Sequence, residues 1–229
     1  MKPLTISYAG ETCEQHGAIL NDYPSFSGGS KIYNTYAVPG MDGELVENTD
    51  YLSNLTITCV FSVVSCRVMD TIRNIRQWLS GTGSLIISDS PDIFYRVLKI
   101  EYGEITREIW KFGTFKVSFL CTPFEYLQDG QLETAALSYN PYDMAKPIYR
   151  IAGEGLCTLT VNHYEFTANI GQNIIINSEL QIAYNTDRES LNSDVTGDYT
   201  KLWLPHGNNQ ISVSEGFQLA ITPQWGYRV

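Results

Sequence analysis

Apolar and polar side chains alternate along much of this chain, which is the pattern of β-strands that bury one face. The clearest cases are residues 55–63 and 115–121, where apolar side chains alternate mainly with Thr, Ser and Lys. Residues 4–8 follow the same rule. The pattern predicts a mainly β protein.

One segment between these strands follows a helical period instead. Its apolar residues recur at spacings of four, three and four, which places them on one helical face: Val68, Ile72, Ile75 and Leu79. Gly81 supplies a C-terminal stop. The spacing predicts one α-helix in the first half of the chain.

Turn and linker residues replace the strand pattern between positions 128 and 147, including Asn140-Pro141 and Lys146-Pro147. Short strands separated by Gly and Asn turns follow, and they predict an antiparallel β-sandwich. The predicted organisation is a domain at residues 1–130, a linker at 131–147 and a second domain at 148–229.

A turn between two long strands lies at Val38-Pro39-Gly40-Met41-Asp42-Gly43-Glu44-Leu45. Pro39 cannot donate to a strand ladder, while Gly40 and Gly43 permit positive φ. This composition predicts a projecting hairpin. We expect its tip to be an interface, formed by Val38, Pro39, Gly40, Met41, Asp42 and Gly43.

The charge balance restricts the classes of partner. The chain has 25 acidic and 15 basic residues and a formal net charge of -10, which argues against binding a phosphate backbone. Charged residues are only 17% and aromatic residues 12%, which indicates large buried or partner-covered surfaces. No apolar run approaches the ~20 residues of a membrane span. The N-terminus has no signal-peptide core, so we expect a soluble protein that is not exported by a signal peptide.

The five cysteines are an odd number and lack CxxC spacing: Cys13, Cys59, Cys66, Cys121 and Cys157. We interpret them as reduced, buried small hydrophobic residues of a protein made in the cytosol. Disulfides are the alternative.

Sequence motifs for catalysis are missing. The chain contains no GxxxxGK[ST], GxGxxG, GxSxG or HExxH. His163-Tyr164-Glu165 provides half of a zinc-deaminase pattern without its PCxxC partner. His16, His163 and His206 are far apart in sequence, and we expect each to be a surface or structural histidine. We therefore predict no catalytic residue, no cofactor and no metal.

Three further segments allow a binding function as an alternative. Residues 185–194 contain three carboxylate side chains and two asparagines, whose oxygens suit calcium, but they do not follow the EF-hand order. A solvated mobile loop is therefore preferred to a calcium site. His206-Gly207-Asn208-Asn209-Gln210 partly matches the HxNxR strand with which galectins bind galactosides, with Trp203 nearby, although Gln210 replaces the arginine. Residues 26–30 could form a phosphate loop, but a flexible surface loop is preferred.

Taken in order, the motifs of this chain resemble the distal tail protein (Dit) of long, non-contractile-tailed bacteriophages. The resemblance covers nearly the whole chain and rests on the order and spacing of motifs that are individually weak. They are Val38 to Leu45, Leu55 to Val63, Ile75 to Leu79, Ser88-Asp89, Phe115 to Phe124, Ile174 to Leu180, Gly197-Asp198-Tyr199, Leu204 to Asn209 and Ile221 to Trp225.

The resemblance implies a structural hub in the tail tip or baseplate of a virion, assembled in the host bacterial cytoplasm. It implies a homo-hexameric ring built by the N-terminal domain, with a galectin-like C-terminal β-sandwich facing outward. One ring face would meet the tail-tube protein and the other the tail-associated fibre protein, and in some members the periphery carries receptor-binding proteins. DNA would pass through the lumen without sequence-specific contacts, and we expect part of the acidic excess to line it.

At the hairpin tip the chain departs from the pattern of the family. The family often has Arg or Lys after the first Gly of the hairpin motif, whereas this chain has Met41. An apolar contact is therefore expected there in place of a charged one.

The alternative function is a glycan-binding adhesin module that uses the C-terminal sandwich, and an enzyme ranks third.

Overall fold

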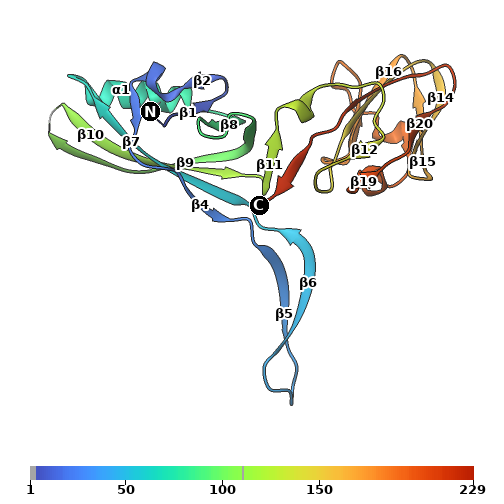
Figure 1. Ribbon diagram of the computed structural model, residues 1–229, viewed down its shortest axis with the longest axis horizontal. Coiled ribbons are helices and arrows are strands. Elements are labelled where there is room, and N and C mark those ends of the chain that lie inside the picture. Colours follow the sequence, from blue (N-terminus) through green and yellow to red (C-terminus); the bar gives the residue numbers. More distant parts are fainter. Residues whose placement is uncertain (1–3, 110) are drawn as a thin grey trace. The chain divides into compact units, whose positions relative to one another are not determined.

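The computed structural model describes residues 4–109 and 111–229, and the chain in it forms two compact units (Figure 1). The first unit extends to Glu125 and includes Arg228 and Val229 at the C-terminus. The second unit is Tyr126–Tyr227. The segment 131–147, predicted as a linker, lies within the second unit.

A ten-stranded antiparallel sheet organises the first unit, with the central order β2-β1-β8-β9-β10-β7-β3. Strand β4 pairs with β7, and β11 pairs with β9 and β22. The bounds are β1 (Ile6–Tyr8), β2 (Glu11–Thr12), β3 (Ala18–Leu20), β4 (Ser25–Gly28), β7 (Leu55–Val64), β8 (Gly83–Ile87), β9 (Ile93–Ile109), β10 (Phe112–Cys121), β11 (Phe124–Leu127) and β22 (Gly226–Arg228). A 3₁₀-helix, η1 (Cys13–His16), joins β2 to β3.

The core of the first unit lies between this sheet and helix α1 (Val68–Trp78). The predicted apolar face of the helix is buried at Val68, Ile72 and Ile75, and Leu79 is buried just after its end. On the sheet side, the alternating residues of β7 and β10 are buried, with Phe61 and Phe115 directly opposite each other. The Tyr102 hydroxyl donates to the carbonyl oxygens of Arg76 and Leu79, which ties β9 to the helix C-terminus. The two-residue period of the strands and the 3.6-residue period of the helix were both predicted correctly here.

Two four-stranded antiparallel sheets form the second unit, in the orders β17-β16-β13-β21 and β18-β15-β14-β20. Their inward residues share one apolar core, so the unit is a β-sandwich. The bounds are β13 (Ile148–Ala152), β14 (Gly155–Val161), β15 (Tyr164–Ile170), β16 (Asn173–Asn177), β17 (Ile182–Tyr184), β18 (Val195–Thr196), β20 (Ile211–Val213) and β21 (Gln218–Thr222). Shorter elements are η2 (Asp129–Gln131), β12 (Tyr139–Asn140), η3 (Asn192–Asp194), η4 (Tyr199–Leu202) and β19 (Gly207–Asn208).

The fold class predicted from the sequence is confirmed. The protein is mainly β, its sheets are antiparallel, and α1 is the single α-helix of residues 4–109 and 111–229. Within that part of the chain, no helix is long and apolar enough to cross a membrane.

Asn140 explains why the segment predicted as a linker is part of the second unit. Its side chain is fully buried, and its amide nitrogen donates to the carbonyl oxygens of Asp143 and Leu204. Its side-chain oxygen accepts the backbone N–H of Tyr142. The turn chemistry was recognised in the sequence, but the buried Asn140 fixes that turn to the sandwich.

The cysteines are all free thiols. Four of them are buried, as predicted, but Cys66 is exposed between the end of β7 and the start of α1, so its predicted burial was wrong. Burial raises the pKa of the Cys59 and Cys121 thiols to about 12 and also raises the pKa of Cys157.

We predict that one of the five thiols reacts quickly with Ellman's reagent in the native protein at pH 8. At that pH a thiol of pKa about 12 is ionised on the order of one part in ten thousand, and burial also blocks the reagent. Denaturant should expose all five, and Cys66→Ser should remove the fast reaction. Two or more fast thiols in the native protein would contradict this assignment.

Candidate functional site: a projecting hairpin

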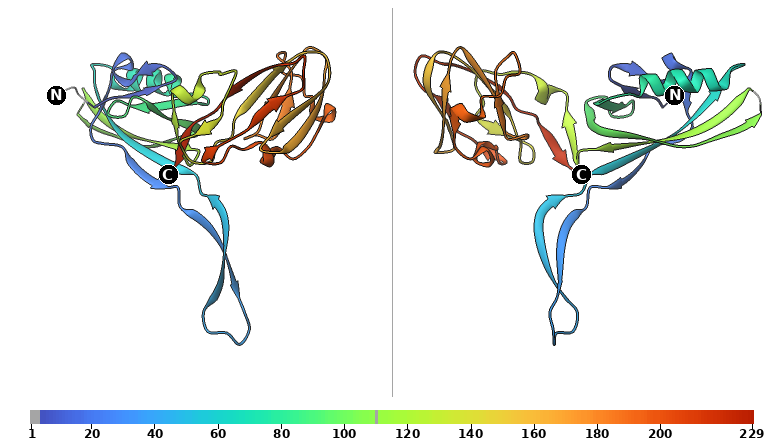
Figure 2. Two further views of the ribbon diagram at one scale, coloured as in Figure 1. Left: turned by 45° about the vertical axis from the view of Figure 1, so that its right-hand side comes forward. Right: turned by 180° about the vertical axis from the view of Figure 1, so that it is seen from behind.

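The hairpin formed by β5 (Lys31–Ala37) and β6 (Glu44–Leu52) is largely exposed to solvent. In the described part of the chain these strands pair only with each other. Figures 1 and 2 show them leaving the sheet as a separate ribbon that ends in a loop. The projecting hairpin expected from the sequence is present.

Two glycines form the bend at the base of the hairpin. Gly28 and Gly29 have φ of 97° and 70°, and a Cβ on Gly28 would lie 2.2 Å from the Asn54 carbonyl oxygen. Beyond the bend, the Ser53 N–H donates to the Ser30 carbonyl oxygen at 2.9 Å. Only glycine fits this backbone path, so the two strands turn out of the sheet together.

The same glycines correct the prediction for residues 26–30. The sequence indicated a flexible surface loop, with a phosphate loop as the alternative. Residues 25–28 instead form β4, in register with β7 from Ser25 opposite Thr58 to Gly28 opposite Leu55. The glycines serve the strand-to-hairpin bend.

The six residues predicted as an interface form the tip of the hairpin, and all six are exposed. The Met41 N–H donates to the Val38 carbonyl oxygen at 3.1 Å, with Pro39 and Gly40 between them and Gly40 at φ 84°. This is the type II pattern, in which Pro presets the second position and Gly supplies positive φ at the third. The turn presents Val38 and Met41 to solvent, and Asp42 follows directly.

Apolar side chains are exposed on both faces of the ribbon. Tyr36 and Leu45 lie opposite each other on one face, while Val46, opposite Thr35, lies on the other. Val46 is 58% exposed and Met41 48%. The complete set of exposed large apolar residues on the hairpin is Ile32, Tyr33, Tyr36, Val38, Met41, Leu45, Val46 and Tyr51. Exposed apolar surface of this extent indicates a site of contact with another molecule.

The hairpin is also acidic. Its sequence from 31 to 52 contains four carboxylic residues and one lysine. The Glu47 carboxylate accepts the Tyr36 hydroxyl at 3.0 Å, which fixes one ring against the ribbon. The surface therefore combines apolar side chains with negative charge, which suits a partner surface that is apolar with a cation at its edge.

The apolar arms of the hairpin were not identified as a site from the sequence, which pointed to the tip alone. The signal was available, because Tyr and β-branched residues are frequent in the segment 31–38. It could not be interpreted without knowing that β5 and β6 have no sheet or helix against them, since such strands are usually half-buried.

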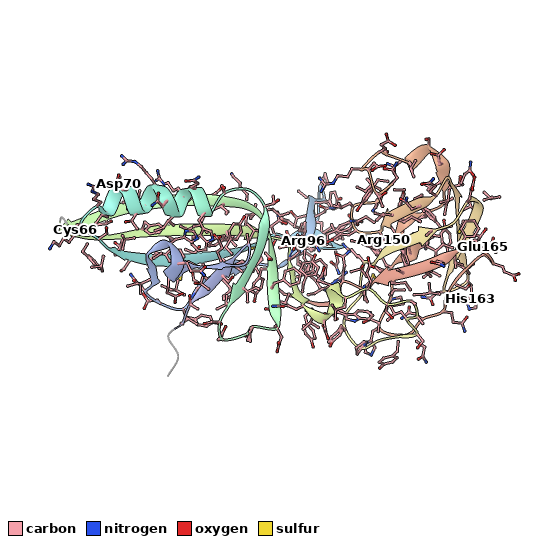
Figure 3. The ribbon with its side chains drawn as sticks, turned by 90° about the horizontal axis from the view of Figure 1, so that it is seen from above. Cys66, Asp70, Arg96, Arg150, His163 and Glu165 are labelled. Carbon is pink, nitrogen blue, oxygen red and sulfur yellow. The ribbon has the colours of Figure 1, made fainter. Side chains whose placement is uncertain are left out.

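The histidines form no metal site. His16 stacks on Trp78 with ring centroids 4.5 Å apart, and its Nε2 lies 2.8 Å from Glu11 Oε2. His163 occupies the two-residue turn between β14 and β15 at φ 71°, with Glu165 on the strand beyond it (Figure 3). His206 Nδ1 lies 3.1 Å from the Tyr142 carbonyl oxygen. Among the described residues, no group of three or more His, Cys, Asp and Glu could hold a metal ion.

Residues 185–194, the calcium alternative, are mostly exposed but internally hydrogen-bonded. The Asn185 side-chain oxygen accepts the Glu189 N–H, and its amide donates to the Glu189 carboxylate at 2.8 Å. Asn192 Oδ1 accepts the Ala183 N–H and the Tyr199 hydroxyl. Asn185 therefore closes the loop on itself, and Asn192 holds the loop to β17. No pattern in the sequence indicated these roles.

The residues of the galactoside alternative are also engaged inside the second unit. Asn209 is buried, and its amide donates to the carbonyl oxygens of Pro205 and Gly207. The Trp203 indole N–H donates to the Ser178 carbonyl oxygen, and Lys146 Nζ lies 4.9 Å from the indole ring centroid. These contacts give Asn209 and Trp203 structural roles within the sandwich.

A comparison with known proteins shows which solved structure has a similar fold. No known protein-family profile matches the sequence, and no curated protein matches it. Among solved structures, the chain is similar to the Dit (gp 19.1) protein of SPP1, described as a paradigm of the hub adsorption apparatus in phages that infect Gram-positive bacteria. The TM-score is 0.69 at 13% sequence identity, over 96% of this chain and 98% of that chain. The chain therefore has the fold of that protein along both units.

We predict that the backbone amides of the β5–β6 hairpin exchange hydrogen much faster than those of β7 and β10 when the protein is dilute. A two-stranded ribbon with no sheet or helix against it is marginally stable in water, whereas the sheet strands are locked by the core. Hydrogen–deuterium exchange with mass spectrometry measures both in one sample. Equal protection of residues 33–47 and 57–63 would contradict this description of the hairpin.

Proposed function

We infer that this protein is a non-enzymatic structural hub of a phage tail tip. The observation that carries the proposal is the match to the Dit fold over nearly the full length of both chains. Within this proposal the protein is a virion component in which the first unit builds a homo-hexameric ring and the second unit is a galectin-like domain on its outer side.

The exposed hairpin supports an assembled state. Each of its eight exposed apolar side chains would contribute at most about 1.5–3 kcal/mol if a partner buried it. A closed ring supplies such a partner at every protomer, because it repeats one pair of complementary surfaces around its axis. The tip residues 38–43 and the arms of the hairpin are the proposed interface.

The proposed neighbours follow from the hub role. The tail-tube protein would stack on one face of the ring and the tail-associated fibre protein on the other, with receptor-binding proteins as further partners at the periphery. The net charge of -10 suits a channel through which DNA passes, because a negative wall does not retain phosphates.

We expect the purified protein at high concentration to have a mass of roughly 155 kDa by light scattering, which is six times the 25.8 kDa protomer. Negative-stain images of the same sample should show six-fold rings. A protein that stays monomeric at every concentration, and that is missing from the tail tips of its virion by antibody labelling, would contradict the proposal.

We predict that Met41→Asp weakens assembly roughly tenfold in protomer concentration, because burying a charge in an apolar contact is unfavourable. Met69→Asp is the matched control, since Met69 on α1 is 40% exposed and Met41 is 48% exposed. Analytical ultracentrifugation measures the change. Unchanged assembly of Met41→Asp would remove the hairpin tip from the interface.

A further inference from the structure

The second unit has a surface cleft beside strand β17, with a volume of about 470 Å³. Most of its wall is apolar. Leu180 is 62% exposed and Ile182 lies at the edge of the sheet. The residues that line it are Leu180, Ile182, Ala183, Tyr184, Arg188 and Ser190.

The walls of this cleft are held in place by hydrogen bonds. On one side, the buried side-chain oxygen of Asn177 accepts the backbone N–H groups of Glu179 and Leu180 at 3.1 and 2.9 Å. On the other side, the Leu191 N–H donates to the Ala183 carbonyl oxygen at 2.8 Å. The shape of the cleft is therefore defined before any ligand arrives, which lowers the entropic cost of binding.

Arg188 gives the cleft its charge. The second unit contains eleven acidic and only four basic residues. Of these four, Arg150 pairs with Glu133, and Lys146 lies over Trp203. The exposed Arg188 guanidinium makes no ion pair with any residue that the structure describes. An apolar cleft with one available cation at its edge favours an apolar side chain adjoined by a carboxylate.

The hairpin tip carries that combination. Met41 is a flexible apolar side chain that adapts to irregular clefts, and the next residue is the exposed Asp42. The type II turn fixes the backbone that presents both. The tip is thus preorganised, and among the described residues no strand other than those of the hairpin itself pairs with it.

We propose that the cleft of each protomer receives the hairpin tip of a second copy of this chain, with Met41 between Leu180 and Ile182 and the Asp42 carboxylate on the Arg188 guanidinium. This rests on the proposed ring, because a cyclic assembly needs two different complementary patches on every copy. The tip is one patch and the cleft is the other.

Charge reversal tests the contact between copies. Asp42→Arg and Arg188→Asp, each alone, place like charges together at every interface. Each should raise the protomer concentration for half-assembly more than tenfold. Both positions are exposed, so circular dichroism should show folded monomers.

An equimolar mixture of these two variants should restore assembly. In a ring that alternates them, the altered tip of the Asp42→Arg copy meets the altered cleft of the Arg188→Asp copy. The native tip of the second copy then meets the native cleft of the first, so opposite charges face each other at every interface. A contact within one chain could not be restored by mixing. If either variant assembles like the wild type, the proposal is overturned while the ring itself stands.

Cysteine cross-linking tests the same contact directly, in a Cys66→Ser background that removes the exposed native thiol. Chains with Met41→Cys are mixed with chains carrying Ile182→Cys and oxidised. The expected product is a disulfide-linked heterodimer. Leu156→Cys, at a position 74% exposed on β14 of the other sheet, is the control that should give none.

The outcomes separate this inference from the hub proposal. Rings without the 41–182 cross-link would overturn the inference alone, and the cleft would then be open to another tail protein. A monomer without the cross-link would contradict both. A Met41→Cys/Ile182→Cys double variant is oxidised in parallel. If its disulfide forms only within one chain, while the mixture of single variants gives no heterodimer, the contact belongs to a single copy and the inference is overturned.

Discussion

A two-stranded ribbon has two open faces, and this constraint governs how the first unit of the protein is used. The β5–β6 hairpin exposes apolar side chains on both faces, and the described residues provide no third strand for it. Burial of such surface is the main favourable term in protein association. We therefore propose that the ribbon is half of an interface that another chain completes.

The rest of the first unit supports this ribbon. Strand β7 pairs with β10, β3 and β4, and its buried face packs against the same core as α1. The hairpin continues directly from β4 and β7 through the bend at Gly28 and Gly29. A force on the tip would thus pass along continuous strands into the core that β7 shares with α1, which suits the proposed role in a tail-tip hub.

The sequence predicted those features that depend on local patterns. The periodicity of 55–63 and of Val68 to Leu79 indicated the strands and the helix, and Pro39 with Gly40 indicated the turn. Features that depend on distant partners were missed. Asn140 looked like an ordinary turn residue, and Gly28-Gly29 looked like a loop, because their roles come from residues such as Leu204 and Asn54. The apolar arms of the hairpin were missed for the same reason.

The most direct test of the central claim is electron cryomicroscopy of the assembled particle. The account predicts a six-fold ring in which residues 31–52 of every protomer lie against another chain. A ring whose hairpins extend free into solvent would contradict it.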